Sequence, residues 1–227
     1  MLKRGLFVCV LGVLLTAMPA LADTIGPFFT TAIPLTTTDW PGTPDATSLT
    51  FQQFDSSLGT LTKVIFNLSG FMNTDITVTN NGGTSSTGDA HTRLRLYIGY
   101  PTVESPTLSL GAPQIDISSD DFVFTNLAPG GSVSESFDDI YFSASKQYTA
   151  ANILAAFTGA GTITLDADTL TQTVVSYSGG NTIATQITEA SLEEGCVTYI
   201  YTPVPEPATI ALLTIGALAS IKRKNSK

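Results

Sequence analysis

The sequence is poor in the residues that form cross-links, bind metals and carry out catalysis: it has two cysteines and one histidine in 227 residues. Cys9 lies inside an N-terminal apolar run, so Cys196 is alone once that leader is removed, and an intramolecular disulfide is excluded. We expect Cys196 to be a small buried residue of a late strand. His91 alone would have to serve a Ser-His-Asp triad, and the sequence has no Gly-x-Ser-x-Gly motif. An enzyme is therefore the least favoured class.

Basic residues are scarce in the middle of the chain. Of the ten lysines and arginines, six lie within the first four or last six residues, and residues 23–203 hold four against eighteen acidic residues. The four are Lys63, Arg93, Arg95 and Lys146. The formal charge of this region is therefore −14. Such a surface repels phosphate backbones, which excludes nucleic acid as a partner, and it attracts divalent cations.

Long hydrophobic runs are also missing, but a short one lies near the N-terminus. Lys3 and Arg4 precede the apolar residues 5–17, and Ala20 and Ala22 supply the small side chains that a signal peptidase recognises. Residues 1–22 therefore form a predicted signal peptide, and cleavage after Ala22 leaves Asp23 as the first residue. A retained anchor is the alternative. It is disfavoured because the run is too short to span a bilayer and a cleavage site follows it directly.

A second short apolar run lies in the C-terminal region, residues 204–227. Residues 208–221 carry no charge, and as a helix they would span about 21 Å, well short of the roughly 30 Å hydrocarbon core. The basic residues in 222–227 are expected to stay cytoplasmic, which places the bulk of the chain outside.

Pro205, Glu206 and Pro207, followed by an apolar helix and a basic terminus, resemble the PEP-CTERM sorting signal of Gram-negative bacteria. The resemblance implies that exosortase, a membrane cysteine protease, cuts near the motif, and that the helix is a transient inner-membrane anchor. A plain tail anchor is the alternative.

Residues 23–203 are typical of a single all-β domain. Leu94, Leu96 and Ile98 alternate with polar or aromatic neighbours, as do Val64, Phe66 and their neighbours, and Gly- and Asn-rich turns separate such segments. A break between strands is expected at residues 69–70, a turn at residues 55–59, and one short helix within 148–157. This pattern predicts a β-sandwich or jelly roll.

The start of the domain, with Asp39-Trp40, the segment 49–55 and the segment 58–61, resembles the choice-of-anchor E domain. The segment 157–163 also fits that family's pattern. The resemblance implies one β-rich domain joined to alternative sorting tails, and it brings no catalytic residues with it.

Acidic residues suggest a calcium site. Asp166 and Asp168 lie two apart and so on one side of an extended chain, and Asp116, Asp120 and Asp121 are candidates to complete a loop site. Solvated acidic loops are the alternative. The other acidic doublets are expected to lie in solvated turns.

The leading functional hypothesis is a non-enzymatic cell-surface or extracellular-matrix protein associated with exopolysaccharide and biofilm, since exosortase systems accompany exopolysaccharide production. A carbohydrate-binding module, with or without calcium, is the alternative, and a secreted hydrolase comes third. A carbohydrate-binding module needs exposed aromatic rings on one sheet face. The candidates are Trp40, Tyr97 and Tyr100, although core or rim packing is the more common use of each.

Overall fold

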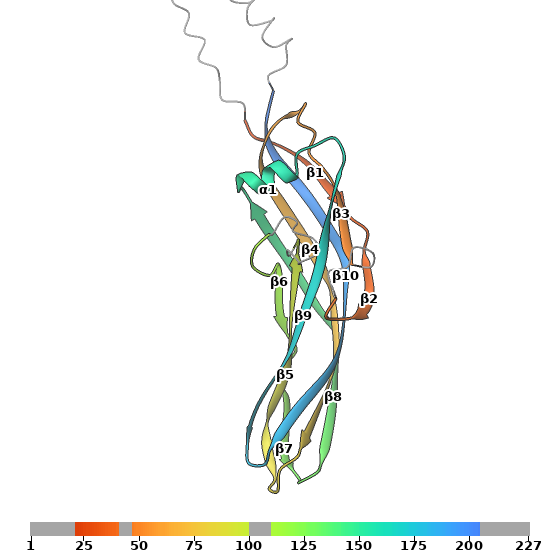
Figure 1. The fold of residues 1–227 in the computed structure, drawn as a ribbon, viewed down its shortest axis with the longest axis vertical. Coiled ribbons are helices and arrows are strands. Elements are labelled where there is room, and N and C mark those ends of the chain that lie inside the picture. The colour runs from red at the N-terminus through yellow and green to blue at the C-terminus, as the bar shows by residue number, and fades with distance from the viewer. Residues whose placement is uncertain (1–20, 41–46, 100–109, 205–227) are drawn as a thin grey trace, which may run out of the picture. The chain divides into compact units, whose positions relative to one another are not determined.

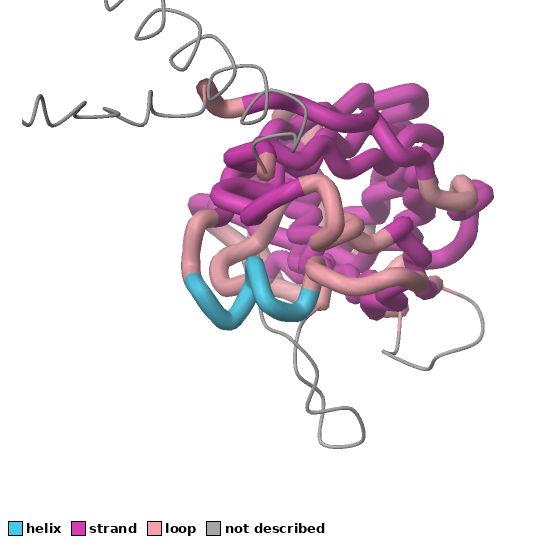
Figure 2. The backbone as a smooth tube through the Cα atoms, turned by 90° about the horizontal axis from the view of Figure 1, so that it is seen from above, coloured by secondary structure: helices cyan, strands magenta, loops and turns pink. Residues whose placement is uncertain are grey.

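The computed structural model describes residues 21–40, 47–99 and 110–204, and they form two antiparallel sheets with one short helix (Figure 1). This confirms the predicted all-β sandwich. Figure 2 shows that strands make up most of this part of the chain. The elements are β1 (Asp23–Phe29), β2 (Ile33–Thr37), β3 (Ser48–Gln52), β4 (Gly59–Asn80), β5 (Ser86–Ile98), β6 (Ile115–Ser118), β7 (Phe122–Leu127), β8 (Ser132–Tyr148), α1 (Ala151–Ala156), β9 (Thr162–Ser178) and β10 (Thr182–Pro203). Residues 22–204 form one compact unit.

The first sheet, called sheet A, has the order β1-β10-β4-β8, with β2 also paired to β10. Its centre is the long ladder between β4 and β10, which runs from the Asn80–Thr182 pair to the Gly59–Pro203 pair. Every even-numbered residue of β4 from Val64 to Asn80 is buried, and the odd-numbered residues between them are half-buried or exposed, as the alternation predicts. The even-numbered residues from Val64 onward therefore face the core.

The expected break at residues 69–70 is wrong, because β4 runs through Ser69 and Gly70 without interruption. A side chain at Gly70 would meet the carbonyl oxygen of Ser191 on β10, and the ring of Phe142 lies over the same position. Gly70 is thus a point of close approach between strands inside a continuous strand, not the start of a turn.

The second sheet, called sheet B, has the order β3-β9-β5-β6, and β7 also pairs with β5. β5 is central to it and pairs with β9 along its length, from Thr87–Ser178 to Ile98–Ala167. The predicted alternation holds, since Leu94, Leu96 and Ile98 are fully buried. The outer face of β5 consists of the half-buried residues Asp89, His91, Arg93, Arg95 and Tyr97.

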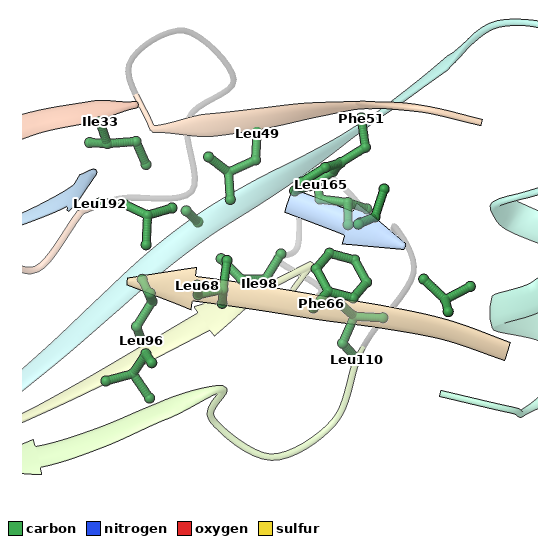
Figure 3. Close-up of a cluster of buried hydrophobic side chains, with 14 of the residues drawn as sticks. Ile33, Leu49, Phe51, Phe66, Leu68, Leu96, Ile98, Leu110, Leu165 and Leu192 are labelled. Carbon is green, nitrogen blue, oxygen red and sulfur yellow. The ribbon is translucent and has the colours of Figure 1, made fainter. Parts of the chain in front are cut away.

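The main core lies between the two sheets and is rich in aromatic rings. Phe66 is surrounded by Phe51, Tyr148 and Phe157, whose ring centroids lie 5.3, 5.7 and 5.4 Å from its own, all in edge-to-face arrangements. Figure 3 shows Leu49 and Phe51 of β3 meeting Phe66 and Leu68 of β4 in this core. Edge-to-face packing is favoured because the positive rim of one ring meets the negative face of the next.

A second, smaller apolar cluster is formed by Ile76, Val78, Ala90, Phe122, Phe124 and Leu127. Buried threonines also lie between the sheets: the Thr74 hydroxyl is 3.0 Å from that of Thr92 and 2.8 Å from that of Thr188. Thr92 also donates to Gln186 at 2.9 Å. These hydroxyls bond one another, so their burial leaves no donor without an acceptor.

The local predictions for the turn and the helix are confirmed. At residues 55–59 the amide of Leu58 donates to the Asp55 carbonyl at 3.1 Å, and the Ser57 amide donates to the Asp55 carboxylate at 2.8 Å. The helix α1 lies inside the expected segment, and Ile153 and Phe157 are buried. Cys196 is buried in β10, as expected of a small apolar residue.

Candidate functional site

A shallow groove lies on the outer face of sheet A, with a volume of about 320 Å³. Its lining comes from three neighbouring strands: Asn67, Leu68 and Ser69 of β4, Tyr141, Ser143, Ala144 and Ser145 of β8, and Glu194 of β10. The strand register creates this set, because Ser69 pairs with Ser143 on one side and with Glu194 on the other. The groove therefore presents four hydroxyl groups, one amide and one carboxylate beside apolar surface that includes Leu68 and Ala144.

An aromatic pair stands at one end of the groove. Tyr141 is 59% exposed, and its ring centroid lies 5.4 Å from that of Phe71, its partner across β4 and β8. β8 is an edge strand of sheet A, so the ring of Tyr141 is open to solvent on the face that carries the groove. An exposed ring beside clustered hydroxyls offers both an apolar surface and hydrogen-bonding groups to one ligand.

Glu194 reaches the groove because β10 is irregular at that point. The pairing with β4 shifts between Leu192 and Glu194, and both Glu193 and Glu194 are exposed. The expectation that this acidic doublet lies in a turn is wrong, since it lies within β10. The bulge explains why two adjacent acids of one strand both reach solvent.

The aromatic residues proposed from the sequence are not those of the groove. Trp40 is 5% exposed and belongs to the core, and its backbone amide donates to Thr169 Oγ1 at 3.1 Å. Tyr97 lies on the outer face of sheet B, paired with Asp168. Tyr100 lies outside the described residues. The sequence analysis missed Phe71 and Tyr141. Phe71 could have been found, because the even-numbered residues of its strand face the core and an aromatic residue at position 71 must then face outward.

The proposed calcium ligands Asp166 and Asp168 lie on the same side of β9, as their spacing predicts. Asp166 is buried. Burial, and secondarily the charge of Asp166, raises the pKa of Asp168. The Oδ2 atom of Asp168 is buried without a hydrogen bond in the part of the chain that the structure describes.

Asp116 and Asp120 lie elsewhere. Asp116 on β6 accepts hydrogen bonds from Arg93 at 2.7 and 2.5 Å, and Arg95 lies 3.6 Å away. The Arg93 guanidinium lowers the pKa of Asp116. Asp120 follows β6 in the turn toward β7. Within residues 21–40, 47–99 and 110–204, the three-ligand group that comes together is instead Asp89, His91 and Asp121.

The sorting signals lie at the limits of the described chain. Ala20 and the motif Pro205, Glu206 and Pro207 fall outside it, whereas Ala22 immediately precedes β1. The described residues contain no helix of the length and hydrophobicity needed to cross a membrane. At the other end, the Val204 amide donates to the Leu58 carbonyl at 3.0 Å. The backbone is therefore hydrogen-bonded to the domain as far as the residue that precedes the motif.

Together these features define a β-sandwich joined to a C-terminal sorting signal. Residues 203–224 match the family model for the PEP-CTERM protein-sorting motif. This match implies an exported protein that is sorted to the cell surface and processed by exosortase. It covers the tail alone, so the resemblance of residues 23–203 to the choice-of-anchor E domain stays a proposal.

Comparison with whole proteins adds little. No curated protein matches the chain. The xylan-binding CBM22-1 domain of Paenibacillus barcinonensis Xyn10C aligns at 10% identity over 81% of this chain and 87% of that one, with a TM-score of 0.19. Dimeric latent PorU from Porphyromonas gingivalis aligns at 13% identity over 81% of this chain and 14% of that one, with a TM-score of 0.17. Likeness at this level carries no functional argument.

Proposed function

We propose that this chain is a non-enzymatic protein of the cell surface or extracellular matrix, and that its groove on sheet A holds exopolysaccharide. The domain at residues 23–203 would be of the choice-of-anchor E type, sorted through a transient inner-membrane stage. The observation that carries the binding proposal is the exposed ring of Tyr141, packed on the half-buried Phe71, beside the hydroxyls that line the groove.

The chemistry of the groove suits a sugar chain. One face of a pyranose ring presents C–H groups, which pack on an exposed aromatic ring such as that of Tyr141. The sugar hydroxyls both donate and accept, and they match the hydroxyls of Ser143 and Ser145, the amide of Asn67 and the carboxylate of Glu194. A shallow, open groove on a sheet face also admits a long polymer, which a closed pocket would not.

The same groove argues for binding without hydrolysis. Glycoside hydrolysis uses two carboxyl groups, about 5 to 9 Å apart across the scissile bond. The described lining supplies one, Glu194. His91 lies on β5 in the other sheet, so it does not join Glu194 in an acid–base pair.

Binding is tested by affinity electrophoresis in gels containing the exopolysaccharide of the producing strain. We expect retardation of the parent protein, and at least tenfold weaker binding for Tyr141→Ala. Tyr177→Ala is the matched control, because Tyr177 is a similarly exposed tyrosine (43%) on β9 of sheet B. Equal retardation of the parent and Tyr141→Ala would refute a polysaccharide site in this groove.

Sorting is tested separately by deleting exosortase from the producing cells. We expect the surface protein to lack residues 208–227 in normal cells, and the uncut chain to collect in the inner membrane of the deletion strain. Unchanged processing would leave a simple tail anchor as the explanation of the C-terminal run.

A further inference from the structure

The outer face of sheet B brings together one histidine and two aspartates that nothing in the sorting signal or the groove uses. Asp89 and His91 lie two residues apart on β5 and so share a face, and Asp121 immediately precedes β7. One side-chain oxygen or nitrogen from each lies within 4.8 Å of those of the other two. His91 Nδ1 is 3.0 Å from an Asp121 oxygen.

Backbone hydrogen bonds hold this arrangement in place. Asp89 pairs with Val123 of β7 and with Ser176 of β9, so its backbone is fixed from both sides. The turn that carries Asp121 is tied to β5 by two bonds between Thr92 and Ser119. The Ser119 amide donates to the Thr92 carbonyl at 2.9 Å, and the Thr92 amide donates to Ser119 Oγ at 3.1 Å. The three ligand groups are therefore gathered by the fold before any ion binds.

The charge around the three residues favours a cation. Arg93 and Arg95 lie next on the same face of β5, but the ion pairs of the described residues direct both of them to Asp116. Among the described residues, the basic side chain paired with Asp121 is His91. Two carboxylates held this close to one another repel, and a bound divalent cation removes that repulsion.

We propose that Asp89, His91 and Asp121 bind one divalent transition-metal ion of the zinc type. One imidazole nitrogen with two carboxylate oxygens is a donor set that suits zinc, whereas calcium prefers six to eight oxygens. Three protein ligands leave a fourth position for water or for a group of a partner molecule. The side chains of His91 and Asp121 are 26% and 63% exposed, so an ion reaches them from solvent.

This site is independent of the polysaccharide groove, which lies on the outer face of sheet A. Metal binding at the site adds a stabilising link between β5 and the turn before β7, since only the folded chain gathers the three ligands.

The test is isothermal titration calorimetry of the full chain, stripped of metal with EDTA, against zinc chloride and then calcium chloride. We expect one zinc ion per chain, with a Kd in the micromolar range, and calcium binding at least tenfold weaker. His91→Gln and Asp121→Asn should each weaken zinc binding at least tenfold. Melting temperature without metal is recorded for each variant, so that a loss of binding is separated from a loss of folding.

Asp120→Asn is the matched control, because it removes the same charge from the same turn and leaves the three ligands in place. Zinc binding by this variant should equal that of the parent. Two results would overturn the site: no heat of zinc binding by the parent, or equal weakening by Asp120→Asn and Asp121→Asn. The second would mean diffuse attraction of the cation to the acidic surface.

Discussion

Phe66 is the residue at which the packing of the core can be tested most directly. Its side chain is fully buried, and it contacts three rings that come from β3, from β8 and from the end of α1. Replacing a buried phenylalanine by alanine costs about 3–5 kcal/mol, and edge-to-face pairs add to the loss of buried area. With three such pairs, Phe66→Ala should lie at the upper end, at about 5 kcal/mol.

Thermal and urea unfolding of the purified chain measure this loss. For a domain of this size, each kcal/mol lowers Tm by about 2–4 °C, so Phe66→Ala should melt about 10–20 °C below the parent. Phe71→Ala is the control. It removes the same ring from the same strand, but from the outer face, where the half-buried ring packs on Tyr141 alone among the described rings and the cost should stay below about 2 kcal/mol.

The comparison of these two variants tests the register of β4. A slip of one residue in a strand moves every side chain to the opposite face. Equal destabilisation by Phe66→Ala and Phe71→Ala, or a larger loss for Phe71→Ala, would refute the assignment of even-numbered residues to the core. Phe66→Leu should recover most of the lost stability, because the volume it leaves empty is smaller.

Three further predictions concern single positions. Burial and the charge of Asp166 raise the pKa of Asp168 above its ordinary value of 3.8, so the ionised carboxylate destabilises the folded state once the pH rises above that value. Asp168→Asn should therefore raise Tm at pH 7. The gain in Tm should shrink toward pH 3.5, where the carboxyl group is protonated in both states. Gly70→Ala should lower Tm by several degrees, because its Cβ would meet the Ser191 carbonyl oxygen. Mass spectrometry of the exported protein should find Asp23, the first residue of β1, at its N-terminus.

Most of the fold could be predicted because the side-chain period of a strand is visible in the sequence. The alternation around Phe66 and around Leu94 indicated which residues face the core, and both sets are buried. The spacing of Asp166 and Asp168 likewise placed both on one side of β9. The continuity of β4 through Gly70 was not predictable, since it depends on how closely β10 approaches.

The sequence named Asp121 as a possible cation ligand, but it did not assemble either candidate site, because both sites depend on pairing between distant strands. Tyr141 meets Phe71 only through the register of β8 on β4, and Asp121 meets His91 only because β7 pairs with β5. A sequence pattern states which face of a strand a residue occupies, but not which strand lies beside it. Bulges add to the difficulty. Glu194 reaches the groove through a shift in the pairing of β10 with β4, and no sequence pattern around Glu194 predicts that shift.

The position of β10 also determines when the protein can fold. This strand pairs with β1, β2 and β4, yet it is the last of the domain to be synthesised and to leave the secretion channel. Asp23 finds its partner Tyr201 only after the intervening chain has crossed the membrane. Sheet A therefore assembles at the end of translocation, just as the sorting motif that follows Val204 becomes accessible to its protease. The strand that completes sheet A and the signal that exosortase recognises are thus adjacent in the chain, so folding of the domain and exposure of the cleavage signal follow one another closely.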